Sequence, residues 1–141
     1  WMARHAGTIF HQRGSGESMT RVLELMARRL RQGRAVAAFP EGGTGAVEKV
    51  RTFHARILQP ALEADVPIQP VALRYSRDGK AWAGVAFGRG ESFFANALRL
   101  IGEAPLEAEV HFLDPLENTG QGRKALASEA RHRVADALGL E

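Results

Sequence analysis

The chain has 141 residues, of which 45% are hydrophobic and 25% charged, a composition typical of a globular protein and unlike that of a disordered or collagen-like chain. It contains no cysteine, which excludes disulfide bonds, a thiolate nucleophile and Cys-ligated zinc, and it has no apolar run of about 18 residues that could cross a bilayer. We expect a single domain over residues 1–141.

Basic residues gather near the N-terminus. The formal net charge is +3, and residues 1–34 hold seven arginines against only Glu17 and Glu24, so the remainder of the chain is slightly acidic. A segment of this charge attracts phosphate groups, whether of a nucleic acid, an anionic lipid or a small phosphoester. The alternative is an ordinary solvated surface in an arginine-rich protein.

The first third of the chain shows the patterns of a strand, a helix and a second strand. Residues 6–13 form a predicted strand that ends at the turn-forming residues 14–16. A helix follows, capped by Ser18 and ended by Gly33, with apolar residues at helical spacing. Residues 35–39 (AVAAF) are continuously apolar, which predicts a strand buried on both faces of a largely parallel sheet.

The middle of the chain alternates helical and extended patterns. Residues 52–64 have helical spacing, but Pro60 must kink or split the helix because it lacks an N–H. Residues 66–75 are predicted as a strand, with their two prolines at its start, at an edge or at a bulge.

The last third completes an alternation of strands and helices. A strand is predicted over residues 82–87, an edge strand with one wet face over 106–112, and a final helix over 123–138. Between the two strands, a helix places three apolar residues on one face: Phe94, Leu98 and Ile101. The whole order predicts an α/β fold, with a mostly parallel mixed sheet flanked by helices.

Familiar catalytic signatures are absent from the sequence. It has no GxSxG, GxxxxGK[ST], GxGxxG or HExxH pattern, and none of its five histidines has a carboxylate at a recognised catalytic spacing. The nearest pairs are His111 with Asp114 and His132 with Asp136, and we expect the second to be an exposed contact on the last helix. These patterns predict no metal site.

The strongest candidate for a binding feature is the glycine-rich segment 39–45 (FPEGGTG), which follows the second predicted strand. Proline ends that strand, and the glycines allow the backbone to turn sharply and to approach a ligand closely. Ligands of α/β sheets bind beyond the carboxyl ends of the strands, which places Glu41 where a substrate would lie. The alternative is an ordinary turn with a surface glutamate.

A second candidate is Arg13, at the end of the first predicted strand (GTIFHQR). Its guanidinium offers a rigid fork of donors that matches phosphate oxygens. Taken alone, a strand-terminal arginine in water is the simpler interpretation.

Together these segments form an ordered set of motifs. Gly7-x-Ile-Phe-x-x-Arg13 precedes a helix, Phe39-Pro-Glu-Gly follows it, and Val66-Pro-Ile-Gln-Pro-Val-Ala comes last. The set resembles the motifs of the glycerophospholipid acyltransferase family, and particularly those of bacterial 1-acylglycerol-3-phosphate acyltransferases. The resemblance extends to residues 51–54 (RTFH) and covers essentially all of residues 1–141 as one acyltransferase-like domain.

The resemblance implies a site for the acyl acceptor. In the family, the arginine that ends the second motif and the Glu-Gly of the third bind the phosphate and glycerol of the acceptor, which correspond here to Arg13, Glu41 and Gly42. Gly43 stands where the family more often has threonine, and Thr44, which follows it, is included as a substrate-binding residue. The fourth motif is associated with the acyl donor or with packing, and here we expect packing. It corresponds to Val66, Pro67, Ile68, Pro70 and Val71.

The first motif of the family, His-x-x-x-x-Asp, does not occur in this sequence. In relatives it lies upstream of the second motif and supplies the general base that deprotonates the acceptor hydroxyl, with the aspartate orienting the imidazole. Its absence agrees with Trp1 being an unnatural first residue. We therefore expect an N-terminally truncated enzyme domain, a C-terminal portion that has no catalytic residue of its own and is inactive by itself.

The function implied by the resemblance is transfer of a fatty acyl group from acyl-ACP or acyl-CoA to a lysophospholipid, first of all 1-acylglycerol-3-phosphate, in bacterial phospholipid biosynthesis. No metal or bound cofactor is implied. Such an enzyme is expected at an anionic membrane, on the cytoplasmic face of the inner membrane. The alternatives are another acceptor such as a lyso-ornithine lipid, or a noncatalytic domain that binds phosphate or anionic lipid. No nucleic-acid partner is expected, since only the charge asymmetry favours one.

Overall fold

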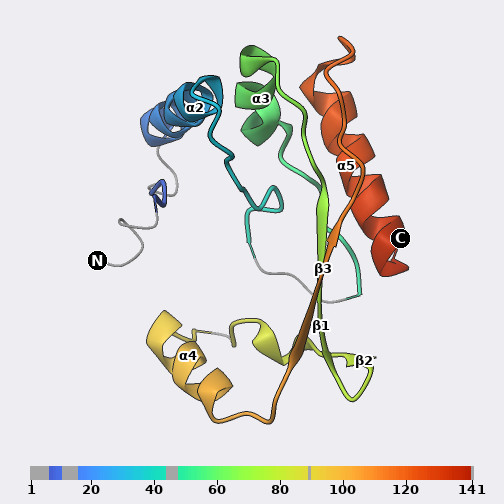
Figure 1. The fold of residues 1–141 in the computed structure, drawn as a ribbon. Helices are drawn as coiled ribbons and strands as arrows, with labels where there is room; N and C mark the ends of the chain where they lie inside the picture. Colours follow the sequence, from blue (N-terminus) through green and yellow to red (C-terminus); the bar gives the residue numbers. More distant parts are fainter. Residues whose placement is uncertain (1–6, 11–15, 44–47, 89, 141) are drawn as a thin grey trace.

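The computed structural model describes residues 7–10, 16–43, 48–88 and 90–140. Within them a long, narrow sheet has a helix along one side and further helices at both ends (Figure 1). Of the predicted first strand, only residues 7–10 are described, and they form no strand. Arg13 and Thr44 lie outside the described residues.

The sheet has three strands, with β1 (Val71–Arg77) in the middle between β2 (Lys80–Ala81) and β3 (Glu107–Phe112). In the described residues β3 has a neighbour on one side only, so it is the edge strand that its alternating pattern predicted. The α/β class is confirmed. The mostly parallel sheet is not found among the described residues, where every pairing of these strands is antiparallel.

Two other predicted strands are corrected by the structure. Residues 35–39 form no strand, and Phe39 is 85% exposed. An apolar run becomes a buried strand only where neighbouring strands hydrogen-bond to its N–H and C=O groups and where side chains cover both of its faces. The described residues provide no such neighbouring strand and no such cover. In residues 82–87 the chain forms the 3-10 turn η2 (Ala83–Val85), and the Trp82 ring lies over Gly84 in space that a Cβ would occupy.

The helices confirm the periodic patterns. Helix α2 (Gly16–Arg31) already includes Ser18, so this serine lies in the first turn and not at the cap. Gly33 follows the helix with φ of 70°, the left-handed conformation common just after a helix ends. Three side chains of α2 are buried: Val22, Met26 and Ala27.

Pro60 divides the predicted helix 52–64 in two, as its missing N–H requires. The 3-10 helix η1 (Ala55–Leu58) is followed at once by α3 (Gln59–Ala64), and Pro60 lies in the first turn of α3. A proline there loses no hydrogen bond, since the first N–H groups of a helix have no partner within it. Helix α3 packs beside α2 (Figure 1).

The core lies between the sheet and α5 (Gly122–Leu138), which packs along it. The buried stripe of α5 includes the predicted Leu126, Ala130 and Val134. These side chains belong to two buried clusters, which are Val50, Ala72, Val134 and Ala135 in one and Leu116, Leu126 and Ala130 in the other. Phe53 packs against both clusters, so the segment before η1 is anchored in the core.

Helix α5 covers only one face of the sheet. Ala72 is fully buried on that face, whereas alternation along β1 turns its neighbours to the other face. The β1–β3 register pairs Val71 with Phe112 and Leu73 with Val110, and these four side chains are 37% to 70% exposed. The dry face predicted for residues 106–112 is therefore uncovered in the described part of the chain.

Helix α4 (Phe93–Ile101) lies at the far end of the sheet from α2 and α3 (Figure 1). It confirms the helix that the spacing of Phe94, Leu98 and Ile101 predicted, but this face is exposed. None of the helices in the described ranges combines the length and the apolar character needed to cross a bilayer.

Candidate functional site

The glycine-rich segment forms a tight turn. The Gly42 N–H donates to the Phe39 carbonyl over 3.2 Å, which closes a four-residue turn with proline second and glycine fourth, positions that such turns favour. Gly42 has φ of 69°, a left-handed conformation that glycine adopts without strain. Pro40 and Gly42 thus favour a turn at residues 39–42, and no strand continues through them.

Residues 50–54 run beside this turn and hold it. The His54 N–H donates to the Pro40 carbonyl over 2.8 Å, and the Arg51 N–H donates to Oε2 of Glu41 over 3.0 Å. Glu41 is partly buried. Its carboxylate therefore has one oxygen in a fixed place against the backbone of Arg51.

One peptide group connects Glu41 to helix α5. The Arg51 N–H that binds Glu41 shares its peptide with the Val50 carbonyl, which accepts bonds from Nε and Nη2 of Arg131 at 3.1 and 2.9 Å. Val50 itself is buried in the core. Hydrogen bonds at both ends of a peptide polarise it in the same sense and strengthen one another. The position of Glu41 thus depends on α5.

Two basic side chains lie against the glycines of the turn. A Cβ on Gly42 would stand 3.1 Å from Cδ2 and 3.2 Å from Nε2 of His54, and a Cβ on Gly43 would stand 3.2 Å from Nη1 of Arg51. Both His54 and Arg51 are exposed. An anionic group that approached the glycines would therefore meet an imidazole and a guanidinium, and a hydroxyl there could donate to the carboxylate of Glu41.

The predicted site residues are in part brought together. Glu41 and Gly42 lie in one turn, while Arg13 and Thr44 lie outside the described residues, so their place in this site stays a prediction. In the fourth motif, Ile68 packs on a core cluster as expected, but Val71 is 41% exposed.

Arg51, His54 and Arg131 are residues that motif reading did not assign to the site. The segment RTFH was part of the family resemblance, and this was the available signal for Arg51 and His54. Nothing in the sequence distinguishes Arg131 from the other arginines of the last helix. Only the fold brings it to the Val50 carbonyl.

The histidine pairs have no catalytic arrangement. His132 Nε2 lies 3.3 Å from Asp136 Oδ2, with both side chains more than half exposed, which confirms the predicted i, i+4 contact. His111 pairs with Glu109 at 3.3 Å and not with Asp114. Across the described ranges, no three His, Asp or Glu side chains gather as a group that could hold a metal ion.

A second polar cluster surrounds Glu91, just before α4. Its carboxylate accepts bonds from Arg99 Nε at 2.9 Å and Arg99 Nη2 at 3.2 Å, from the Gly88 N–H at 2.7 Å and from the Asn96 amide at 3.1 Å. The bond from Arg99, then those from Gly88 and Asn96, lower the pKa of Glu91 to about 2. The cluster fastens α4 to the loop before it.

Comparison with known proteins points to one family. Residues 1–74 match the family model described as Acyltransferase. The chain is 38% identical over 138 residues to a lyso-ornithine lipid O-acyltransferase of Pseudomonas aeruginosa, an alignment that covers 98% of this chain and 53% of that protein. It is 32% identical over 74 residues to 1-acyl-sn-glycerol-3-phosphate acyltransferases of Neisseria gonorrhoeae and Neisseria meningitidis, covering 52% of this chain and 29% of each relative. The chain thus spans about half the length of the first relative. No solved structure matches it significantly.

Proposed function

The chain belongs to the acyltransferase family, and we propose that it forms the acceptor-binding part of an enzyme that transfers a fatty acyl group from a thioester to a lyso-lipid. One observation carries the proposal. The matched region contains the turn 39–42 and the next residue, Gly43, where a fixed carboxylate and the exposed side chains of Arg51 and His54 surround two glycines. A lyso-lipid acceptor has a free hydroxyl and an anionic head group. The carboxylate can accept a hydrogen bond from the hydroxyl, and the two basic side chains can bind the head group.

The acceptor we propose first is a lysophospholipid, 1-acylglycerol-3-phosphate. The two Neisseria relatives are named for this substrate. A lyso-ornithine lipid is the second candidate, since a relative named for that substrate aligns over 98% of this chain. The two acceptors differ in charge, since one carries a phosphate and the other an amino acid, so a binding experiment can separate them.

The remaining parts of the proposal concern the site and its setting. Arg13 and Thr44 complete the acceptor site, acyl-ACP or acyl-CoA is the donor, and the protein works at the cytoplasmic face of a bacterial inner membrane. Residues 1–141 act as one domain. The sequence contains no His-x-x-x-x-Asp pattern, so the chain alone binds the acceptor without the general base and its orienting aspartate.

NMR titration tests acceptor binding. Short-chain 1-acylglycerol-3-phosphate and lyso-ornithine lipid, each kept below its micelle-forming concentration, are added to the labelled chain. We expect saturable shifts of the Gly42 and Gly43 amides and of the His54 ring, with the phosphate ester competing against inorganic phosphate. Shifts spread over the surface without saturation would contradict the site.

A thioester-release assay tests the absence of turnover. With an acyl donor and either acceptor, we expect the chain alone to be slower by about 10² to 10⁴ than a protein that carries the base, since this is the usual contribution of general base catalysis. The comparison is the same chain joined to an N-terminal segment that supplies a His-x-x-x-x-Asp motif. Equal turnover would overturn this part of the proposal.

A further inference from the structure

Helix α4 turns its polar side toward the protein and its apolar side away from it. Asn96 is buried and donates to Glu91 Oε2, and Arg99 donates both to Glu91 and to the Gly84 carbonyl, the last over 2.7 Å. On the opposite side of the helix, three large apolar side chains are more than half exposed: Phe94, Leu98 and Ile101. A surface helix of a globular protein has the reverse arrangement, with its apolar stripe on the core.

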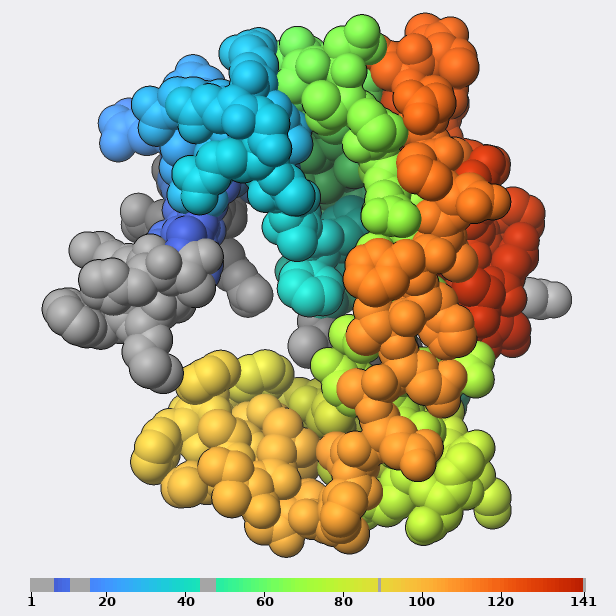
Figure 2. Space-filling view, viewed as in Figure 1, coloured from blue at the N-terminus to red at the C-terminus, as the bar shows by residue number. Residues whose placement is uncertain are grey.

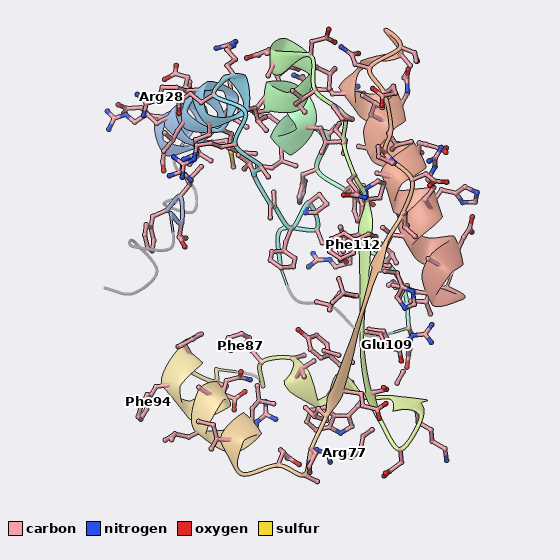
Figure 3. All side chains as sticks on the ribbon, in the orientation of Figure 1. Arg28, Arg77, Phe87, Phe94, Glu109 and Phe112 are labelled. Atoms are coloured by element: carbon pink, nitrogen blue, oxygen red, sulfur yellow. The ribbon has the colours of Figure 1, made fainter. Side chains whose placement is uncertain are left out.

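Among the residues that the structure describes, α4 lies apart from α2. Figure 2 shows its surface at one end of the molecule, separated by a gap from the surface of α2. Phe87, which precedes α4 and is 43% exposed, lies close to the helix (Figure 3). Figure 3 also shows that Phe94 on α4 and Arg28 on α2 lie on the same side of the molecule, opposite the side formed by α5.

Exposed cations lie at the other end of the sheet from this apolar face, and one of them, Arg28, is on the same side of the molecule (Figure 3). Arg28 and Arg31 in the last turn of α2, and Arg34 just after it, are exposed, and none of the three forms an ion pair with another described residue. The burial of Val22 and Met26 on the other face of α2 keeps Arg28 turned outward. Exposed arginines and an apolar helix face on one side of a molecule complement the phosphates and acyl chains of an anionic bilayer.

We propose that α4 is a membrane-inserting element, whose apolar face enters the boundary between the head groups and acyl chains of an anionic bilayer while the arginines at the end of α2 bind lipid phosphates. Its 9 residues are far short of the roughly 20 that span a bilayer, so the helix lies in the plane of the interface. The inference rests on the proposed function in one respect, since a lyso-lipid acceptor is an amphiphile that resides in this interface.

The absence of cysteine from the chain allows a sharp test of this inference, because one introduced cysteine can carry an environment-sensitive fluorophore such as NBD. Phe94→Cys places the label on α4, and Phe112→Cys places it at another exposed phenylalanine, which is 70% exposed. The labelled proteins are mixed with vesicles of phosphatidylcholine alone or of phosphatidylcholine with phosphatidylglycerol. We expect a blue shift and a gain of intensity at position 94 only, with the anionic vesicles only, and a decrease with salt.

A second measurement uses co-sedimentation with the same anionic vesicles. The double variant Leu98→Ser with Ile101→Ser should bind at least about tenfold more weakly, because each apolar side chain that leaves the bilayer loses its burial. Phe112→Ser is the matched control, since Phe112 is 70% exposed, and this variant should bind as the unchanged chain does. These side chains are exposed, and circular dichroism verifies that each variant stays folded.

Three outcomes would overturn the inference. The label at position 94 remains in water with anionic vesicles, or the label at position 112 enters the bilayer in its place. In the third outcome, the label at position 94 is already shielded in buffer without lipid, which would show that a second copy or another segment covers α4. The acceptor titration uses no bilayer, so failure of insertion and failure of acceptor binding are distinguishable.

Discussion

Glu41 and Arg131 bind the two ends of one peptide group. Nη2 of Arg131 donates to the Val50 carbonyl at 2.9 Å, and the Arg51 N–H of the same peptide donates to Glu41 at 3.0 Å. The first residue lies in the candidate acceptor turn and the second in the helix that forms the core. Arg131 therefore helps to position the Glu41 carboxylate, which we propose binds the acceptor, through the peptide between Val50 and Arg51.

Arg131→Met tests this relationship. The variant removes the donor from the Val50 carbonyl, so we expect faster hydrogen exchange of the Arg51 amide and a loss of about 1.5 kcal/mol from the free energy of unfolding. Arg133→Met is the control on the same helix, because Arg133 binds Glu129 and the Asp114 carbonyl. Equal exchange of the Arg51 amide in both variants would show that Arg131 does not position the turn.

Two substitutions of Glu41 separate its charge from its hydrogen bond. Glutamine keeps an oxygen that can accept the Arg51 N–H but has no charge, whereas alanine loses both. We expect Glu41→Gln to keep the native Arg51 amide shift and to bind the acceptor about tenfold more weakly, in line with the loss of a charged hydrogen bond. Glu41→Ala should also change the Arg51 shift. Native acceptor affinity in Glu41→Gln would show that the charge is not used.

Gly42→Ala tests the approach of His54 to the turn. The left-handed conformation, with φ of 69°, costs an L-residue about 1 to 2 kcal/mol, and the new Cβ would stand 3.1 Å from the imidazole. Gly33→Ala is a matched control, since φ is 70° there and nothing lies within 4 Å of the added Cβ. Urea denaturation should show the larger loss of stability for Gly42→Ala. Equal losses would mean that His54 moves aside at no cost.

The attachment of α4 should depend on pH through Glu91. Its pKa is about 2 in the folded protein against an ordinary value of 4.5, so the stabilisation from the ionised carboxylate is fully present above about pH 4.5 and is lost as the pH falls through 2. The Gly88 amide, which donates to this carboxylate, should report a titration midpoint of about 2 by NMR. Glu91→Gln should abolish that transition. A midpoint at the ordinary value would show that the bonds from Arg99 do not persist in solution.

Arg13 remains the predicted phosphate ligand. Arg13→Ala should weaken binding of 1-acylglycerol-3-phosphate by about tenfold, equivalent to about 1.4 kcal/mol, and Arg13→Lys should recover part of it because lysine lacks the bidentate fork. Arg21→Ala is the control, since Arg21 is exposed and pairs with Glu17 on α2. Equal affinities in all three variants would remove Arg13 from the site.

The sequence by itself determined the helices, because the interactions that decide them act within one or two turns of chain. The apolar spacing in residues 19–30, 94–101 and 123–138 predicted α2, α4 and α5, and the missing N–H of Pro60 predicted the division between η1 and α3. The motif FPEG likewise indicated a turn that holds Glu41 and Gly42, since its proline and glycine favour one locally.

Only the tertiary structure decided which apolar surfaces are covered and which distant groups meet. The run at 35–39 is apolar enough for a buried strand, but the described residues place no strand beside it. Phe94 and Ile101 share a predicted helix face, yet that face points outward because Asn96 and Arg99 bind the loop before the helix. Periodicity shows which residues share a face, because that depends on local helix or strand geometry. Whether the face is buried depends on elements far away in the sequence, as does the contact of Arg131 with Val50.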